Sequence, residues 1–181
     1  MFKLSIFRGA LLAVLAAPAS LLAFLTGWAA ADWRWGALAG AAVFTLFFAA
    51  AVVNILRARN YSYADCLLPP LFSLAWSLVL VPLSFGERLF TAPAFIGSAV
   101  LLGACMAMVR LDGMRNRRLL WLPVVVFAYE MLPVNIPGPF DDYFSFGGAF
   151  VNSLFTAVKT RLFAGLAAAA RELLRRKSAG L

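Results

Sequence analysis

Long apolar stretches alternate with short clusters of charge along the chain, and this pattern predicts membrane-spanning helices. Four uncharged stretches of 21 to 23 residues lie between charged side chains, at 9–31, 35–56, 66–86 and 89–109. About 20 helical residues cross the ~30 Å hydrocarbon core of a bilayer, where the backbone must satisfy its own hydrogen bonds. Strands of a β-barrel would alternate apolar and polar side chains over ~10 residues, and these stretches do not. We therefore expect one helix in each stretch.

Two further stretches are less regular. Residues 119–136 are uncharged except for Glu130, and residues 143–158 are uncharged before Lys159. Basic side chains near a helix end reach back to the headgroups, so the last span extends beyond its charge-free length. We predict an all-α, polytopic transmembrane bundle whose C-terminal segment, 161–177, forms a basic amphipathic helix in the cytoplasm or on the inner leaflet. The six expected spans are 9–31, 35–56, 66–86, 89–109, 119–136 and 143–160.

The distribution of lysine and arginine predicts that both termini are cytoplasmic. With the N-terminus inside, six spans leave 14 of the 16 basic residues inside and only Arg34 and Arg88 outside. Basic residues that flank membrane helices are retained in the cytoplasm. A five-span alternative would put the basic tail outside, so six spans are favoured.

Composition supports a membrane protein and explains the net charge. The 181 residues suit a single integral membrane domain, and 64% are hydrophobic while 13% are charged. Soluble proteins average roughly 45–50% and 25%. The net charge of +8 lies in short loops and the tail, where it sets topology and meets anionic headgroups of the lipid bilayer. We therefore expect no nucleic-acid partner. The abundance of Ala, Leu, Arg and Gly suggests a bacterial source and hence the inner membrane.

Small residues recur at helical spacing in the second stretch, at Gly36, Ala37, Gly40 and Ala41. Such residues allow the backbones of membrane helices to approach closely. Packing inside one bundle is the favoured interpretation, and a docking face for another membrane subunit is the alternative.

The absence of histidine narrows the chemistry. Without it, histidine-ligated haem, most zinc and iron sites and Ser-His catalysis are excluded. The chain also has no Cys-x-x-Cys pair and no phosphate-binding Gly-x-x-x-x-Gly-Lys loop. We expect Cys66 and Cys105 to be buried, reduced thiols. The sequence predicts no cofactor and no metal, and it disfavours enzymatic activity without excluding it.

Glu130 is the one acidic residue inside an expected span. It lies eleven residues past Leu119, or ~16 Å along a helix. A lone carboxylate in the bilayer costs roughly 2.5–3.5 kcal/mol, so it must be paired, protonated or facing a polar cavity. It is a candidate proton carrier, and the alternative is a structural hydrogen bond between two helices. The candidate partners are Asn54, Asn135, Asn152, Lys159 and Arg161.

The segment 133–148 is the most unusual stretch of the chain. Three prolines and Gly138 interrupt regular helix over 133–139. Asp141 and Asp142 then stand where the positive end of the next helix favours carboxylates. One interpretation is an outside turn with an acidic helix start. The other is an irregular segment that lines a substrate cavity, walled by the aromatic residues Phe140, Tyr143, Phe144 and Phe146.

Three classes of function remain. The first is a small transporter, or the substrate-binding membrane subunit of a transport system, with its site at Glu130, Asn135, Asp141, Asp142 and Asn152. In size and topology it is similar to the substrate-capturing subunits of energy-coupling-factor vitamin transporters. The second is a non-catalytic accessory or scaffold subunit of a larger membrane or envelope complex. An intramembrane enzyme ranks last, because nothing marks a paired-carboxylate active site.

Overall fold

The computed structural model describes residues 2–58, 61–83, 92–131 and 140–178. These residues form seven α-helices and two 3-10 turns, and none of them lies in a strand. The all-α prediction is confirmed. The chain divides into two compact units, Met1–Asp65 and Cys66–Leu181, which we describe separately. Their union in one membrane domain stays a prediction.

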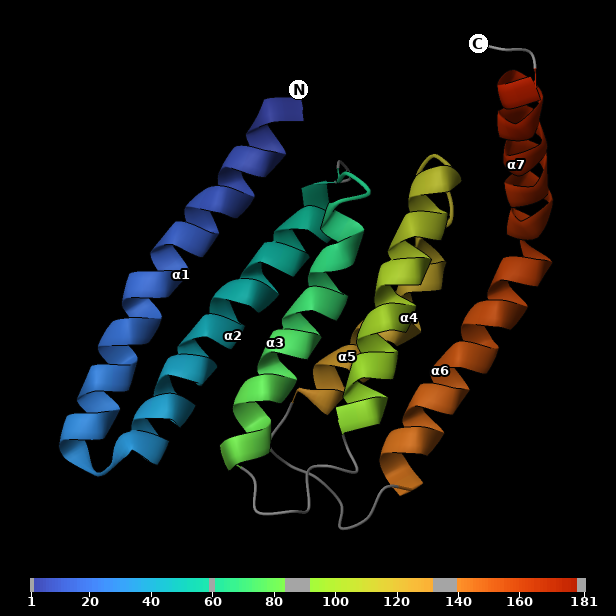
Figure 1. Cartoon of the computed structure of the whole chain (residues 1–181). Coiled ribbons are helices and arrows are strands. Elements are labelled where there is room, and N and C mark those ends of the chain that lie inside the picture. Colours follow the sequence, from blue (N-terminus) through green and yellow to red (C-terminus); the bar gives the residue numbers. More distant parts are fainter. Residues whose placement is uncertain (1, 59–60, 84–91, 132–139, 179–181) are drawn as a thin grey trace. The chain divides into compact units, whose positions relative to one another are not determined.

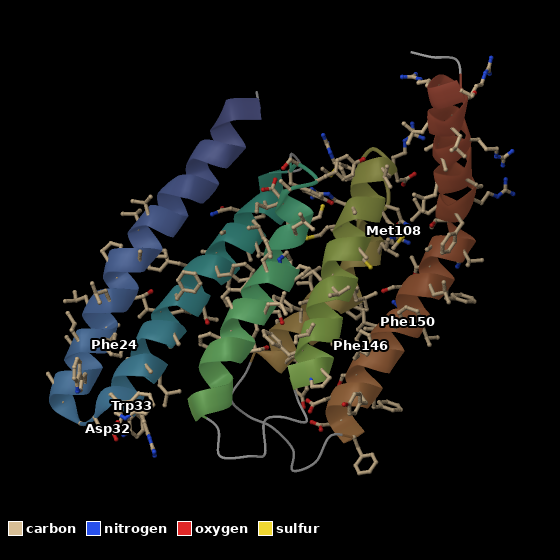
Figure 2. All side chains as sticks on the ribbon, in the orientation of Figure 1. Phe24, Asp32, Trp33, Met108, Phe146 and Phe150 are labelled. Atoms are coloured by element: carbon tan, nitrogen blue, oxygen red, sulfur yellow. The ribbon has the colours of Figure 1, made fainter. Side chains whose placement is uncertain are left out.

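The first unit is a hairpin of two long helices, α1 (Phe2–Ala30) and α2 (Trp33–Ala58) (Figure 1). Asp32 forms the turn, which Figure 2 shows beside Trp33. One carboxylate oxygen of Asp32 accepts hydrogen bonds from the backbone N–H groups of Arg34 (2.8 Å) and Trp35 (3.1 Å). Since the first N–H groups of a helix have no partner within the helix, this cap explains why α2 begins where it does.

The two helices of the hairpin touch through their backbones. A Cβ atom placed on Gly36 would lie 2.6 Å from the carbonyl oxygen of Phe24, and one on Gly40 would lie 2.9 Å from that of Ser20. Any larger side chain at either position would push the helices apart. The predicted close packing within the chain through Gly36 and Gly40 is confirmed.

The second unit is built around α4 (Ala92–Leu111), which contacts α3 (Leu68–Leu83), α5 (Trp121–Glu130) and α6 (Phe140–Lys159) (Figure 1). Short 3-10 turns precede α3 and α5, at Asp65–Leu67 and Arg117–Leu120. The last helix is α7 (Leu162–Ser178). The core of this unit lies along α4, and its fully buried members there are Ala99, Leu102, Cys105, Met106 and Val109.

Close contacts join α4 to its neighbours. A Cβ atom on Gly103 would lie 2.5 Å from the carbonyl oxygen of Cys66, so the start of the α3 segment rests directly on α4. The ring of Phe146 covers Gly97, where a Cβ atom would lie 3.1 Å from Cε2. Cys66 and Cys105 are both buried free thiols, as expected.

The fifth helix is shorter than predicted. The expected span 119–136 begins as a 3-10 turn through Leu120, becomes α-helical at Trp121 and ends at Glu130. Its 10 residues rise only ~15 Å, about half of a bilayer core. Glu130 therefore lies at the end of a helix and not in its middle. Residues 132–139, which hold the prolines, lie outside the described residues.

Two helices in the described part of the chain are long and apolar enough to cross a membrane, over Trp33–Arg57 and Pro93–Leu111. Within α1, the segment Val14–Ala30 is also apolar. By length and composition these segments suggest membrane association, and the six predicted spans stay a prediction.

The exposed and buried faces of α6 are the reverse of those on a helix in a water-soluble protein. Its buried positions hold Asp142, Ala149, Ser153 and Ala157, which are small or polar. The opposite face carries large apolar side chains, and Phe155 is 69% exposed. Further exposed members of that face are Phe140, Phe144, Val151 and Val158. Large apolar side chains are normally the most buried in water-soluble folds.

Candidate functional site

Four acidic or phenolic side chains meet where α5 ends and α6 begins. Tyr129 and Glu130 are the last two residues of α5, while Asp141 and Asp142 lie in the first turn of α6. The hydroxyl group of Tyr129 donates a hydrogen bond of 2.9 Å to Oδ2 of Asp141. We call these four residues the acidic cluster.

The carboxyl groups of Glu130 and Asp142 lie close enough to interact, and Asp141 adds its charge to the same site. Asp142 is only 1% exposed. A hydrogen bond between two carboxyl groups requires one of them to keep its proton, because two ionised carboxylates in contact repel each other. The two carboxyl groups can therefore hold a proton between them.

Two oxygens of the cluster still have hydrogen-bonding capacity. Oε1 of Glu130 and Oδ1 of Asp141 are buried, and among the described residues neither has a hydrogen-bond partner. Buried polar atoms are normally satisfied, so such atoms mark a place where water, a proton or a ligand group can bind.

The start of α6 explains why two adjacent aspartates are tolerated here. The first N–H groups of a helix are unpaired within it and carry partial positive charge, which favours nearby carboxylates. The hydroxyl group of Ser145 donates a 2.7 Å hydrogen bond to the backbone carbonyl of Asp141, one turn earlier. The helix thus fixes both aspartates at its end, facing the end of α5.

The structure brings together three of the five predicted site residues, Glu130, Asp141 and Asp142. Asn135 lies outside the described residues. Asn152 is exposed on α6, ten residues and hence ~15 Å along the helix from Asp142. Asn152 is therefore not part of the acidic cluster.

The proposed charge partners of Glu130 are also placed elsewhere. Lys159 and Arg161 are exposed at the far end of α6, ~25 Å from Asp142 along the helix. Asn54 is exposed and belongs to the first unit. The structure does not bring Lys159 or Arg161 to Glu130.

The four aromatic residues that one interpretation placed in a cavity wall do not all face the interior of their unit. Phe144 is 84% exposed, and Phe140 and Tyr143 are exposed too. Phe146 alone of the four turns toward α4, where it covers Gly97 (Figure 2). Phe140, Tyr143 and Phe144 share one face at i, i+3 and i+4 spacing, and that face is exposed, whereas Phe146 lies farther round the helix.

Tyr129 was missed as a site residue. Its position next to Glu130 was the only available signal, because its partner Asp141 is twelve residues away. Ser153 was missed for the same reason: its hydroxyl group lies against the thiol of Cys105 on α4. Both contacts cross between helices.

The cluster does not form a metal centre. Among the described residues, no group of three or more His, Cys, Asp or Glu side chains is arranged to hold a metal ion.

Comparison of the chain with family models, curated proteins and solved structures found no significant match.

Proposed function

We propose that the protein is a multipass protein of the bacterial inner membrane, with six spans and both termini in the cytoplasm. The reversed faces of α6 support this proposal most directly. The outer face of α6 carries exposed phenylalanine and valine side chains from Phe140 to Val158. Such a face is stable in lipid, whereas in water it would drive association. Small residues on the inner face are what packing between membrane helices requires.

We further propose that the protein is a small transporter, or the substrate-binding membrane subunit of a transport system, with its site at the acidic cluster and the 133–148 segment. The single observation that carries this is the adjacency of Glu130 and Asp142, with a buried oxygen of Glu130 lacking a partner among the described residues. The carboxyl groups make the site negative, which favours a proton or an organic cation over an anion.

The topology is tested by labelling single cysteines in intact cells. In a Cys66→Ala/Cys105→Ala background, Arg34→Cys lies in an expected outside loop and Arg115→Cys in an expected inside loop. A membrane-impermeant maleimide should label the first in intact cells and the second only after the cells are broken. Labelling of Arg115→Cys in intact cells, or release of the chain by alkaline carbonate, would contradict the topology or the membrane insertion.

Glu130→Gln tests the site, with Glu172→Gln on exposed α7 as the matched control. Purified variants are reconstituted in liposomes that contain a pH-sensitive dye, and melting temperatures are measured with organic amines and with matched carboxylates. We expect the wild type and the Glu172→Gln control to show one of two behaviours. Either they carry protons into the liposomes, or organic amines raise their melting temperature while the matched carboxylates do not. Glu130→Gln should lose this behaviour while it folds normally.

Two other outcomes would overturn the transport proposal. If neither variant changes flux or binding, but Glu130→Gln no longer co-purifies with a partner in mild detergent, the protein is an accessory subunit. In that case the hydrogen bond between Tyr129 and Asp141 has a structural role and holds α5 against α6. If Glu130→Gln matches the wild type in every measurement, Glu130 has neither role.

A further inference from the structure

The last helix, α7, has an apolar face that nothing in its unit covers. Leu162 is buried at its start, and beyond it the described side chains are exposed except for half-buried Leu166. Leu173 and Leu174 are each 68% exposed. At 100° per residue, the large apolar residues fall on one side of the helix. They are Leu162, Phe163, Leu166, Leu173 and Leu174.

The opposite face of α7 is basic. Arg171 and Arg175 lie there and are exposed, and Arg176, also exposed, lies at the border of the two faces. Glu172 on the same face pairs with Arg176 one turn later, at 3.2 Å. Four basic residues and one acidic residue in 171–177 leave this end of the helix with a net charge of +3.

Two residues, Thr160 and Arg161, separate α7 from α6. Arg161 has φ of 58°, the left-handed conformation that commonly ends helices. Its N–H group donates to the carbonyl of Val158, and its own carbonyl accepts from Ala164 and Gly165 in the first turn of α7. The chain therefore stops one helix and starts another at Arg161, as the separate ribbons of Figure 1 show. This allows α7 to take a direction of its own.

We infer that α7 lies on the cytoplasmic surface of the bilayer, with its leucine face among the upper acyl chains and its arginine face on anionic phospholipid headgroups. This inference rests on the proposed membrane topology, because α6 then ends at the headgroups and delivers α7 to them. A helix with a strong apolar face and a basic polar face has the composition of a surface-bound membrane helix. Anionic lipids complement its charge, which a second copy of α7 would repel.

The inference is tested with the full chain in lipid nanodiscs, which leave both leaflets accessible. In the Cys66→Ala/Cys105→Ala background, a spin label is attached at Leu173→Cys or at the matched polar-face position Arg175→Cys. Collisions with oxygen report lipid, and collisions with a water-soluble nickel chelate report water. In discs that contain phosphatidylglycerol, we expect at least a threefold higher oxygen-to-nickel ratio at 173 than at 175. The difference should shrink in discs of phosphatidylcholine alone and in high salt.

Charge removal gives a second measurement. Arg171→Gln/Arg175→Gln/Arg176→Gln should lower the ratio at 173 in anionic discs toward its value in neutral ones. Arg57→Gln/Arg115→Gln/Arg118→Gln, which changes three arginines outside α7, should not. Equal ratios at 173 and 175 in every lipid would overturn the inference, as would spin–spin broadening at 173 that increases with protein density and marks a second copy. The same labelled chains are also tested for release from the membrane by alkaline carbonate. If they are retained, a negative result at position 173 concerns α7 and not the membrane insertion of the chain.

Discussion

The hydroxyl group of Tyr129 donates a 2.9 Å hydrogen bond to Oδ2 of Asp141 and so joins the end of α5 to the start of α6. The two residues are separated by a segment that holds three prolines, so no continuous helix holds them together. This bond and the adjacent carboxyl groups of Glu130 and Asp142 fix the geometry of the acidic cluster. A change at Tyr129 should therefore alter both the stability and the cluster.

Tyr129→Phe removes this bond and keeps the ring. A hydrogen bond to a charged acceptor contributes about 1.5–3 kcal/mol, and the partly buried position of this one suggests the lower end of that range. We expect a loss of about 1–2 kcal/mol in the free energy of unfolding, measured by denaturant titration in detergent. Tyr143→Phe, on the exposed side of α6, is the matched control and should be nearly neutral. Equal losses in both variants would show that Tyr129 does not act through Asp141.

Two glycines in the second unit should respond to alanine in opposite directions. Gly103→Ala places a Cβ atom 2.5 Å from the backbone carbonyl of Cys66, so α4 and the α3 segment must separate. Overpacking of this kind costs about 1–3 kcal/mol. Gly147→Ala, inside α6, meets nothing within 4 Å and gains about 0.5–1 kcal/mol from helix propensity. Thermal unfolding in detergent measures both, and a stable Gly103→Ala variant would contradict the close backbone contact.

The helices were predictable because their signal is local. Charged residues mark the ends of the apolar stretches, and the bounds of α2 and α4 fall within three residues of the predicted spans. The start of α1 was not predicted, because the helix runs through Arg8 and begins at Phe2, seven residues before the expected start. Glycine spacing in α2 likewise indicated a close helix contact, since only glycine permits it. The end of α5 at Glu130 was missed, because an apolar composition continues past it to the prolines while the helix does not.

Three of the four residues of the acidic cluster were predictable, but their contacts were not. Asp141 and Asp142 were recognised because carboxylates at a helix start have a physical reason that sequence shows. Their pairing with Tyr129 and Glu130 is a contact between the end of α5 and the start of α6, which periodicity along one helix does not encode. Lys159 and Arg161 were expected near Glu130 on charge alone, and the length of α6 puts them at its other end.

Asp32 tests the turn of the first unit. Its carboxylate caps α2 through two backbone N–H groups, and replacing such a cap with alanine costs about 0.5–2 kcal/mol. Asp32→Ala should lower the melting temperature of the chain in detergent, whereas Asp32→Asn keeps a capping oxygen and should recover most of the loss. If both variants melt at the same reduced temperature, the charge of Asp32 matters more than its hydrogen bonds.

The two faces of α6 give the sharpest test of a lipid environment. Ala157 is buried, and Ala157→Phe inserts a ring between packed helices, at an expected cost of about 1–3 kcal/mol. Phe155 is 69% exposed, and in the proposed topology Phe155→Ala removes a ring that faces lipid. Removing a buried phenylalanine costs about 3–5 kcal/mol, but at this position we expect less than about 1 kcal/mol, since lipid fills the space. Denaturant unfolding in mixed micelles measures both variants. A loss of about 3 kcal/mol or more for Phe155→Ala would mean that the outer face of α6 packs against protein, and the assignment of that face to lipid would be wrong.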